Sequence, residues 1–148
     1  MRLALCLLPL LAACASYNVQ VYGSFDRAQK TMTVTQGGSG LSGYLKTRLR
    51  DAGWQLAVDA GPEVTRGTVA DGQIDTVRGG TFRTRYRMQL WAECTSVLLS
   101  GRRMYVYDIS IVDNESGAEL LTMAGEAIDY KIADRLLMAI SQNEEPHS

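Results

Sequence analysis

The residues best suited to chemistry lie in the segment GGSGLSGYL, where Gly38, Gly40 and Gly43 form the pattern G-x-G-x-x-G. A strand-like run, KTMTVT, precedes these glycines, and a helix-like run, LSGYLKTRLRDA, follows them. Asp59 ends the next strand-like run, 21 residues after Gly38. This spacing is typical of a dinucleotide-binding loop, in which glycines let the backbone approach a pyrophosphate and the acid binds a ribose. The segment therefore raises the question of a nicotinamide cofactor.

The rest of the chain argues against that cofactor. A dinucleotide site requires two β-α-β halves, because the cofactor lies across both. Here one such unit is followed by an antiparallel meander, and no Lys-Ser/Thr pair comes directly after Gly43, as it would in a P-loop. We predict no cofactor and interpret the glycines as a flexible helix start that packs closely on a sheet. Because a helix N-terminus attracts anions, Gly38, Gly40 and Gly43 remain a candidate loop contact for a partner.

The sequence contains few residues from which a metal site or an activated nucleophile could form. The only histidine is His147, near the end of the chain, and Cys94 is isolated, so neither a metal cluster nor a histidine-activated nucleophile is expected. Among sixteen acidic residues, some two carboxylates could always be paired for acid–base hydrolysis. Nothing in the sequence, however, distinguishes a mid-strand acid such as Asp108 from an ordinary solvent-exposed one. We predict no enzyme activity and no metal. Cys94 is predicted to be a buried small apolar residue, with an intermolecular disulfide as the alternative.

Arg83, Arg85 and Arg87 occupy alternate positions, which places them on one strand face about 7 Å apart. Solvent, acids on a neighbouring strand or an anionic partner must compensate these charges. Residues 78–103 hold six arginines against one acid, whereas residues 104–148 hold nine acids against two basic residues. These regions could compensate each other in the fold, or the arginines could face phospholipid headgroups, lipopolysaccharide phosphates or an acidic protein. Trp91, expected on the same face, would suit such an interface.

Hydrophobic periodicity predicts the elements that position these residues. Apolar residues at alternate positions indicate strands, and apolar residues spaced by three and four indicate helices. Residues 59–81 have weak periodicity and are predicted to form a long excursion, with short strands near Val64–Val69 and Ile74–Val77. The strands are expected at 17–25, 30–35, 54–58, 82–94, 103–112 and 118–128, and the helices at 41–52 and 132–142. Strands in runs with two separate helices predict an α+β fold, a mostly antiparallel sheet with both helices packed on one face.

The N-terminus has the character of an export signal. MRLALCLLPLLAAC places one arginine before an apolar run that is too short to span a bilayer. The run ends in Leu11-Ala12-Ala13-Cys14, which resembles the lipobox of bacterial lipoproteins. The resemblance implies cleavage before Cys14, acylation of Cys14 and, because Ala15 follows rather than Asp, sorting to the outer membrane. An ordinary secretory peptide or a buried apolar strand is the alternative.

The length of 148 residues suits one domain, and a formal net charge of −1 gives no reason to expect nucleic acid as a partner. We divide the chain into a signal peptide, a lipidated Cys14 with a short tether, one periplasmic domain and a frayed tail. These parts cover residues 1–13, 14–18, 19–142 and 143–148. The tether reaches roughly 15 Å at most, so the domain should lie close to the membrane.

These features predict an outer-membrane-anchored periplasmic lipoprotein. It would be a non-enzymatic accessory or scaffold subunit of an envelope secretion, pilus, export or assembly machine, by analogy of size and layout rather than by a specific motif. Opposite charge on two faces would suit a homo-oligomeric ring. The alternative is a binding module for an anionic lipid or glycan that uses the arginine strand and Trp91.

Overall fold

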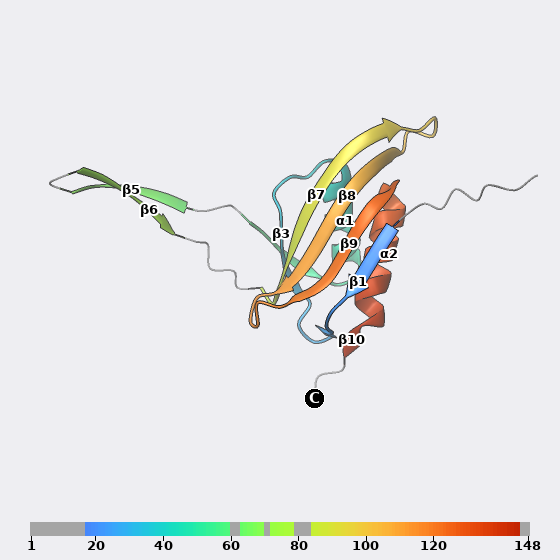
Figure 1. Ribbon diagram of the computed structural model, residues 1–148, viewed down its shortest axis with the longest axis horizontal. Helices are drawn as coiled ribbons and strands as arrows, with labels where there is room; N and C mark the ends of the chain where they lie inside the picture. Colours follow the sequence, from blue (N-terminus) through green and yellow to red (C-terminus); the bar gives the residue numbers. More distant parts are fainter. Residues whose placement is uncertain (1–16, 60–62, 70–71, 79–83, 146–148) are drawn as a thin grey trace, which may run out of the picture.

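The computed structural model describes residues 17–59, 63–69, 72–78 and 84–145, which form the α+β fold predicted from the sequence. Six strands make the main sheet in the order β1-β9-β8-β7-β3-β4, and both helices lie on one side of it (Figure 1). The strands of this sheet are β1 (Tyr17–Val21), β3 (Thr31–Val34), β4 (Gln55–Val58), β7 (Tyr86–Val97), β8 (Arg103–Asp113) and β9 (Glu119–Ile128). The helices are α1 (Gly40–Asp51) and α2 (Asp129–Gln142).

Four shorter strands form two separate pairs. β2 (Phe25–Asp26) pairs in parallel with β10 (Glu144–Glu145). β5 (Glu63–Val69) pairs antiparallel with β6 (Gly72–Arg78), so the long excursion predicted from the sequence contains a hairpin close to the two short strands expected there.

The sheet combines a meander with one β-α-β unit. β7, β8 and β9 are antiparallel neighbours, and β1 pairs antiparallel with the outer side of β9. β3, α1 and β4 form the parallel unit that the glycine segment predicted, since β3 and β4 are adjacent and parallel. β3 also pairs in parallel with β7, but only through Met32 with Tyr86 and Thr33 with Arg87.

The core lies between the sheet and the two helices, which also contact each other. The alternation on β8 is borne out, because Tyr105, Tyr107, Ile109 and Ile111 are all buried. The apolar stripes of the helices cover this face. They consist of Leu41, Leu45 and Leu49 from α1 and Ile132, Ala133, Leu136, Ala139 and Ile140 from α2.

Local sequence explains where α1 begins and ends. Ser39 occupies the N-cap position with extended backbone, although its side chain makes no capping hydrogen bond. Gly53 follows the last turn with φ of +87°, the left-handed conformation that glycine adopts most easily. Among the described residues, neither helix is long and apolar enough to cross a membrane.

The C-terminal segment differs from its prediction as a frayed tail. Glu144–Glu145 form β10, and the N–H of Phe25 donates to the carbonyl of Asn143 at 2.8 Å. The Glu144 carboxylate also pairs with Lys30 at 2.8 Å. The segment is held in place because β2, far away in sequence, provides its strand partner, and Lys30, a few residues after β2, provides its countercharge. The predicted signal peptide, Cys14 and residues 146–148 lie outside the described residues.

Candidate functional site

A candidate binding feature is the outer edge of β7 from Gln89 to Val97, here named the open edge. β3 pairs with β7 only as far as Arg87, and within the described part of the chain no strand continues the sheet beyond that point. Backbone N–H and C=O groups on such an edge can pair with an added strand. Trp91 lies on this segment with 57% of its surface exposed, as the sequence predicted for an outward position.

Two hollows flank the gap where β3 and β7 separate. A groove of about 410 Å³ on the helix side brings the glycine segment, through Ser39 and Gly40, near Cys94 and Arg103. A second hollow of about 320 Å³ includes Trp91. Both are lined by Thr35 at the end of β3 and Leu90 on β7, and the second also by Gln89, Asp108 and Ser110. The tertiary structure thus brings the glycine segment and the open edge together.

Two of the three candidate glycines are required by local packing. A Cβ atom on Gly43 would lie 2.1 Å from the carbonyl oxygen of Gly38. Gly40 has φ of +60°, and a Cβ there would lie 3.2 Å from the hydroxyl oxygen of Tyr105. These contacts agree with a close-packed helix start. Gly38 has no atom within 4 Å of the position of a Cβ, so it alone offers open space to a partner.

Lys46 on α1 binds the backbone of the glycine segment at Gly37. Its ammonium donates a hydrogen bond to the carbonyl oxygen of Gly37, and the Ser42 hydroxyl donates to the same oxygen at 3.4 Å. Burial, and secondarily the charge of Arg50, lower the pKa of Lys46. The segment is therefore held to its own helix by a partly desolvated cation.

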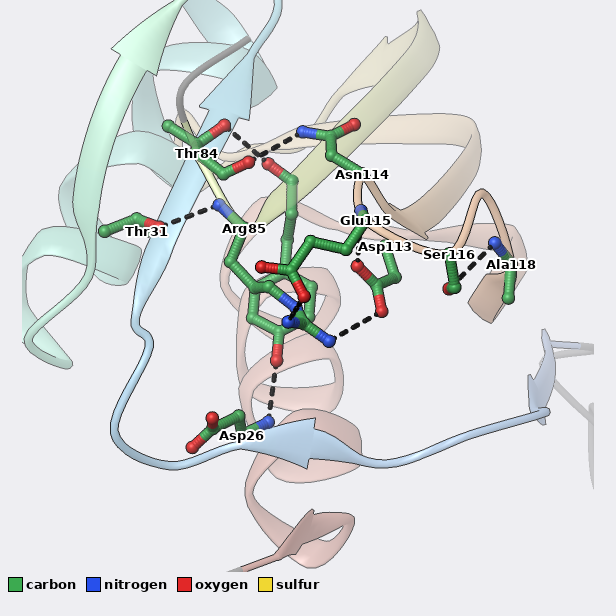
Figure 2. A network of polar contacts seen from close by, with 10 residues as sticks. Asp26, Thr31, Thr84, Arg85, Asp113, Asn114, Glu115, Ser116 and Ala118 are labelled. Atoms are coloured by element: carbon green, nitrogen blue, oxygen red, sulfur yellow. Dashed lines mark hydrogen bonds and ion pairs between the residues drawn. The ribbon is translucent and has the colours of Figure 1, made fainter. Parts of the chain in front are cut away.

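Arg85, the middle of the three candidate arginines, lies in an internal network just before β7 (Figure 2). Arg85 pairs with Asp113, the last residue of β8, at 2.8 Å and with Glu115 in the turn that follows β8. Its backbone N–H donates to the Thr31 hydroxyl at 2.8 Å, and the Asn114 amide donates to the Thr84 carbonyl at 2.9 Å. For Arg85, acids on a neighbouring element thus provide the compensation, which was one of the alternatives that the sequence left open.

Asp113 is the buried acid of this network. Burial alone would raise the pKa of its carboxyl, but several interactions with the charged form outweigh burial and hold the pKa below its ordinary value. They are a hydrogen bond from the Glu115 N–H, a hydrogen bond from the Ser116 hydroxyl and the charge of Arg85. The carboxylate therefore remains charged over the neutral range and fixes the turn to the start of β7.

The predicted combination of arginines with Trp91 does not form one patch around Arg85. Arg83 lies outside the described residues, and Arg87 is half-buried. Trp91 comes six positions after Arg85, a distance of about 20 Å along an extended strand. The geometry therefore gives no support to a single anion-binding face made of Arg85 and Trp91.

Cys94 is exposed, which corrects the prediction that it is buried. It does share a face with buried Tyr86 and Met88, as alternation indicated, but Ala92 and Cys94 lie beyond the part of β7 that the helices cover. Alternation shows which residues share a face, but not how far the opposite layer extends.

Sequence reasoning missed the apolar turn between β7 and β8. Val97, Leu98 and Leu99 are exposed there, next to the turn residues Ser100 and Gly101. Three consecutive apolar residues beside a turn break the alternation of both strands, and that irregularity was the available signal.

Metal and histidine chemistry find no site in the described ranges. No group of three or more His, Cys, Asp or Glu side chains there could hold a metal ion. The sole histidine, His147, lies outside them.

Fold and surface together define a small α+β protein with an open strand edge. No family model matches the sequence, and no curated protein matches it. Two similar solved structures are PelC dodecamers from Paraburkholderia phytofirmans. One is a single-residue variant with TM-score 0.45 and 10% identity, over 76% of this chain and 79% of that chain. The other has TM-score 0.46 and 12% identity, over 89% of this chain and 100% of that chain. At these scores, neither match bears on what this chain does.

Proposed function

We propose that the protein is an outer-membrane lipoprotein that serves as a non-enzymatic accessory or scaffold subunit of an envelope secretion, pilus, export or assembly machine. The observation that carries the proposal is the distance between the lipobox cysteine and the fold. Cys14 stands three residues before Tyr17, the first residue of β1. Three residues span about 10 Å when fully extended, so acylation of Cys14 would hold the domain against the periplasmic surface of the membrane.

A scaffold role is supported by the strand edges. The open edge of β7 offers backbone groups over Gln89–Val97 with no strand partner on that side among the described residues, and it carries Trp91 and borders two hollows. β1 lies at one end of the sheet, so its outer side is a second edge. Contact between two different edges of neighbouring copies is heterologous and closes into a ring when the rotation permits. The dodecamers described above belong to other proteins, and for this chain a ring is a proposal that rests on its own two edges.

A cross-linked pull-down from detergent-solubilised envelopes tests the anchor and the partner together. The C-terminally tagged protein would be compared with its Cys14→Ser variant, and the captured proteins would be identified by mass spectrometry. We expect a stoichiometric outer-membrane partner, or further copies of this chain, that disappears with Cys14→Ser. Mass spectrometry of the intact protein would show the acyl chains directly.

A photo-reactive amino acid placed in the open edge locates the interface. Glu93 is exposed on β7, whereas Lys131 is equally exposed on α2 and provides the matched control. We expect cross-links from position 93 and few from position 131. Equal cross-linking from both positions would refute the open edge as the interface. An unacylated protein without a stoichiometric partner would refute the proposed function.

A further inference from the structure

The turn between β7 and β8 carries an exposed apolar apex. We name the segment Val97–Arg103 the β7–β8 tip. Val97 is 64% exposed, Leu98 is 38% exposed, and Leu99 is fully exposed. Single exposed apolar residues are ordinary, but three consecutive ones at the end of a projecting hairpin form a contiguous apolar surface. Such a surface indicates a partner that is itself apolar.

The backbone fixes this exposure. The N–H of Leu98 donates to the carbonyl of Arg102 at 2.8 Å, and the N–H of Gly101 donates to the carbonyl of Leu98 at 2.8 Å. Gly101 has φ of +77°, which completes a tight three-residue loop. The loop therefore holds Leu99 at the apex, where the side chain cannot fold back onto the core without breaking these hydrogen bonds.

Basic residues lie directly behind the apolar apex. Arg102 lies 4.7 Å from the centre of the Tyr130 ring and 3.7 Å from a carboxylate oxygen of Asp129. Arg103 is exposed and has no acid within 4.0 Å among the residues that the structure describes. An apolar apex with arginines behind it matches the order of a phospholipid surface, in which hydrocarbon lies beneath a layer of phosphates.

Strand register places the tip at the same end of the sheet as the start of β1 (Figure 1). Tyr17 lies opposite Gly125, and Gly125 lies opposite Tyr107 on β8. β1 runs away from the tip, so Tyr17, its first residue, is the end of β1 that lies nearer to the tip. From the level of Tyr107, β8 extends four more residues to Arg103, about 13 Å, before the loop begins.

This distance exceeds the reach of the tether. Cys14 is three residues from Tyr17, so an acylated Cys14 lies within about 10 Å of Tyr17. If the strands stand upright on the membrane, the bilayer surface lies no farther along the sheet than about the level of Met104. The tip, which projects beyond that level, must then enter the lipid.

We infer that the β7–β8 tip inserts Leu98 and Leu99 into the phospholipid surface beside the acylated Cys14, with Arg103 at the phosphates. The inference rests on the proposed lipid anchor and adds an orientation to it. One anchor point leaves a domain free to rotate, whereas a second contact at the tip sets the sheet upright, so that the open edge of β7 runs along the membrane normal and its free hydrogen-bonding groups point parallel to the membrane plane.

Depth-dependent fluorescence quenching tests this inference on the exported, mature protein. A Cys94→Ser, Ser100→Cys variant would carry an environment-sensitive fluorophore at the tip, and Cys94→Ser, Gln142→Cys would carry it at the far end of α2. Both would be reconstituted into vesicles of phosphatidylethanolamine and phosphatidylglycerol. Spin-labelled lipids quench a fluorophore within the bilayer, whereas aqueous iodide quenches one in water.

We expect lipid quenching at position 100 with roughly ten-fold less quenching by iodide than at position 142, because an anion enters hydrocarbon poorly. Adding Leu98→Gln and Leu99→Gln should restore iodide quenching at position 100 while the protein still floats with the vesicles. Iodide quenching at position 100 equal to that at position 142, in protein that floats, would overturn the inference and leave the anchor standing.

Two further outcomes also decide the question. Protection from iodide without quenching by spin-labelled lipid would show that the tip is covered by protein, such as a second copy, and would overturn the inference. Protein that does not float with the vesicles would refute the anchor and the inference together.

Discussion

Replacing Asp113 with Asn tests the network that fastens the last turn of the meander to the start of β7. The Asp113 side chain is 8% exposed and lies 2.8 Å from the Arg85 guanidinium, which is 21% exposed. Asn is nearly the same size and can still accept the hydrogen bond from the Glu115 N–H. The substitution therefore removes the charge and leaves the shape of the turn intact.

The magnitude follows from the partners that remain. Removing one member of a fully buried ion pair costs about 3–5 kcal/mol, because it leaves an uncompensated charge. Arg85 keeps Glu115 as a second partner and keeps part of its surface in water. We therefore expect a loss of about 2 kcal/mol in the free energy of unfolding, closer to that of a hydrogen bond to a charged group. For a domain of this size, that loss lowers the melting temperature by roughly 8 °C.

The same substitution predicts a pH dependence with a definite sign. The pKa of Asp113 is lowered in the folded state, so on acidification the unfolded chain binds this proton first. The stabilisation that the Asp113 carboxylate provides is complete at pH values above its ordinary pKa of 3.8. It is lost as the pH falls through the lowered pKa of the folded state. The free energy of unfolding of the wild type should exceed that of Asp113→Asn by a constant amount across the neutral range. This difference should become smaller as the pH falls below about 4.

Urea denaturation followed by circular dichroism at a series of pH values measures both effects. Asp108→Asn is the matched control, because Asp108 is an exposed acid on the same strand. It should change the unfolding free energy by less than about 0.5 kcal/mol. An Asp113→Asn effect no larger than the control at neutral pH, or one that stays undiminished in strong acid, would refute the reasoning.

Three further substitutions or treatments test the packing. Gly43→Ala should lower the free energy of unfolding by about 1–3 kcal/mol, because the added methyl group would clash with the Gly38 carbonyl. Gly38→Ala is the control, because its methyl group would meet no atom within 4 Å. A lower melting temperature for Gly38→Ala than for Gly43→Ala would contradict this contact. Leu136→Ala removes a fully buried side chain and should cost about 2–5 kcal/mol, against less than about 0.5 kcal/mol for exposed Met138→Ala. Chemical denaturation compares the two, and equal losses would refute the placement of α2. Cys94 should react with a thiol reagent in the native protein, and a reaction that required denaturant would show that it is buried after all.

Much of the fold was predictable because local periodicity carries it. Alternation at Tyr105–Ile111 and spacing of three and four at Leu41–Leu49 are consequences of strand and helix geometry, so each segment shows its own type. Gly53 marks the end of α1 for an equally local reason, because glycine adopts the left-handed conformation at little cost. The glycine pattern predicted the β-α-β unit, and the strands that followed argued against a second half.

The tertiary structure decided what surrounds each of those segments. β3 ends its pairing with β7 at Arg87, which leaves the open edge, and the helices stop short of Cys94, which leaves that residue exposed. Arg85 pairs with acids at the end of β8 and in the turn after it, 28 and 30 residues later in the chain. Strand order, the extent of the covering layer and the partner of a charge all depend on contacts between distant segments. Periodicity within one segment records which residues share a face, and only the packed fold determines what that face meets.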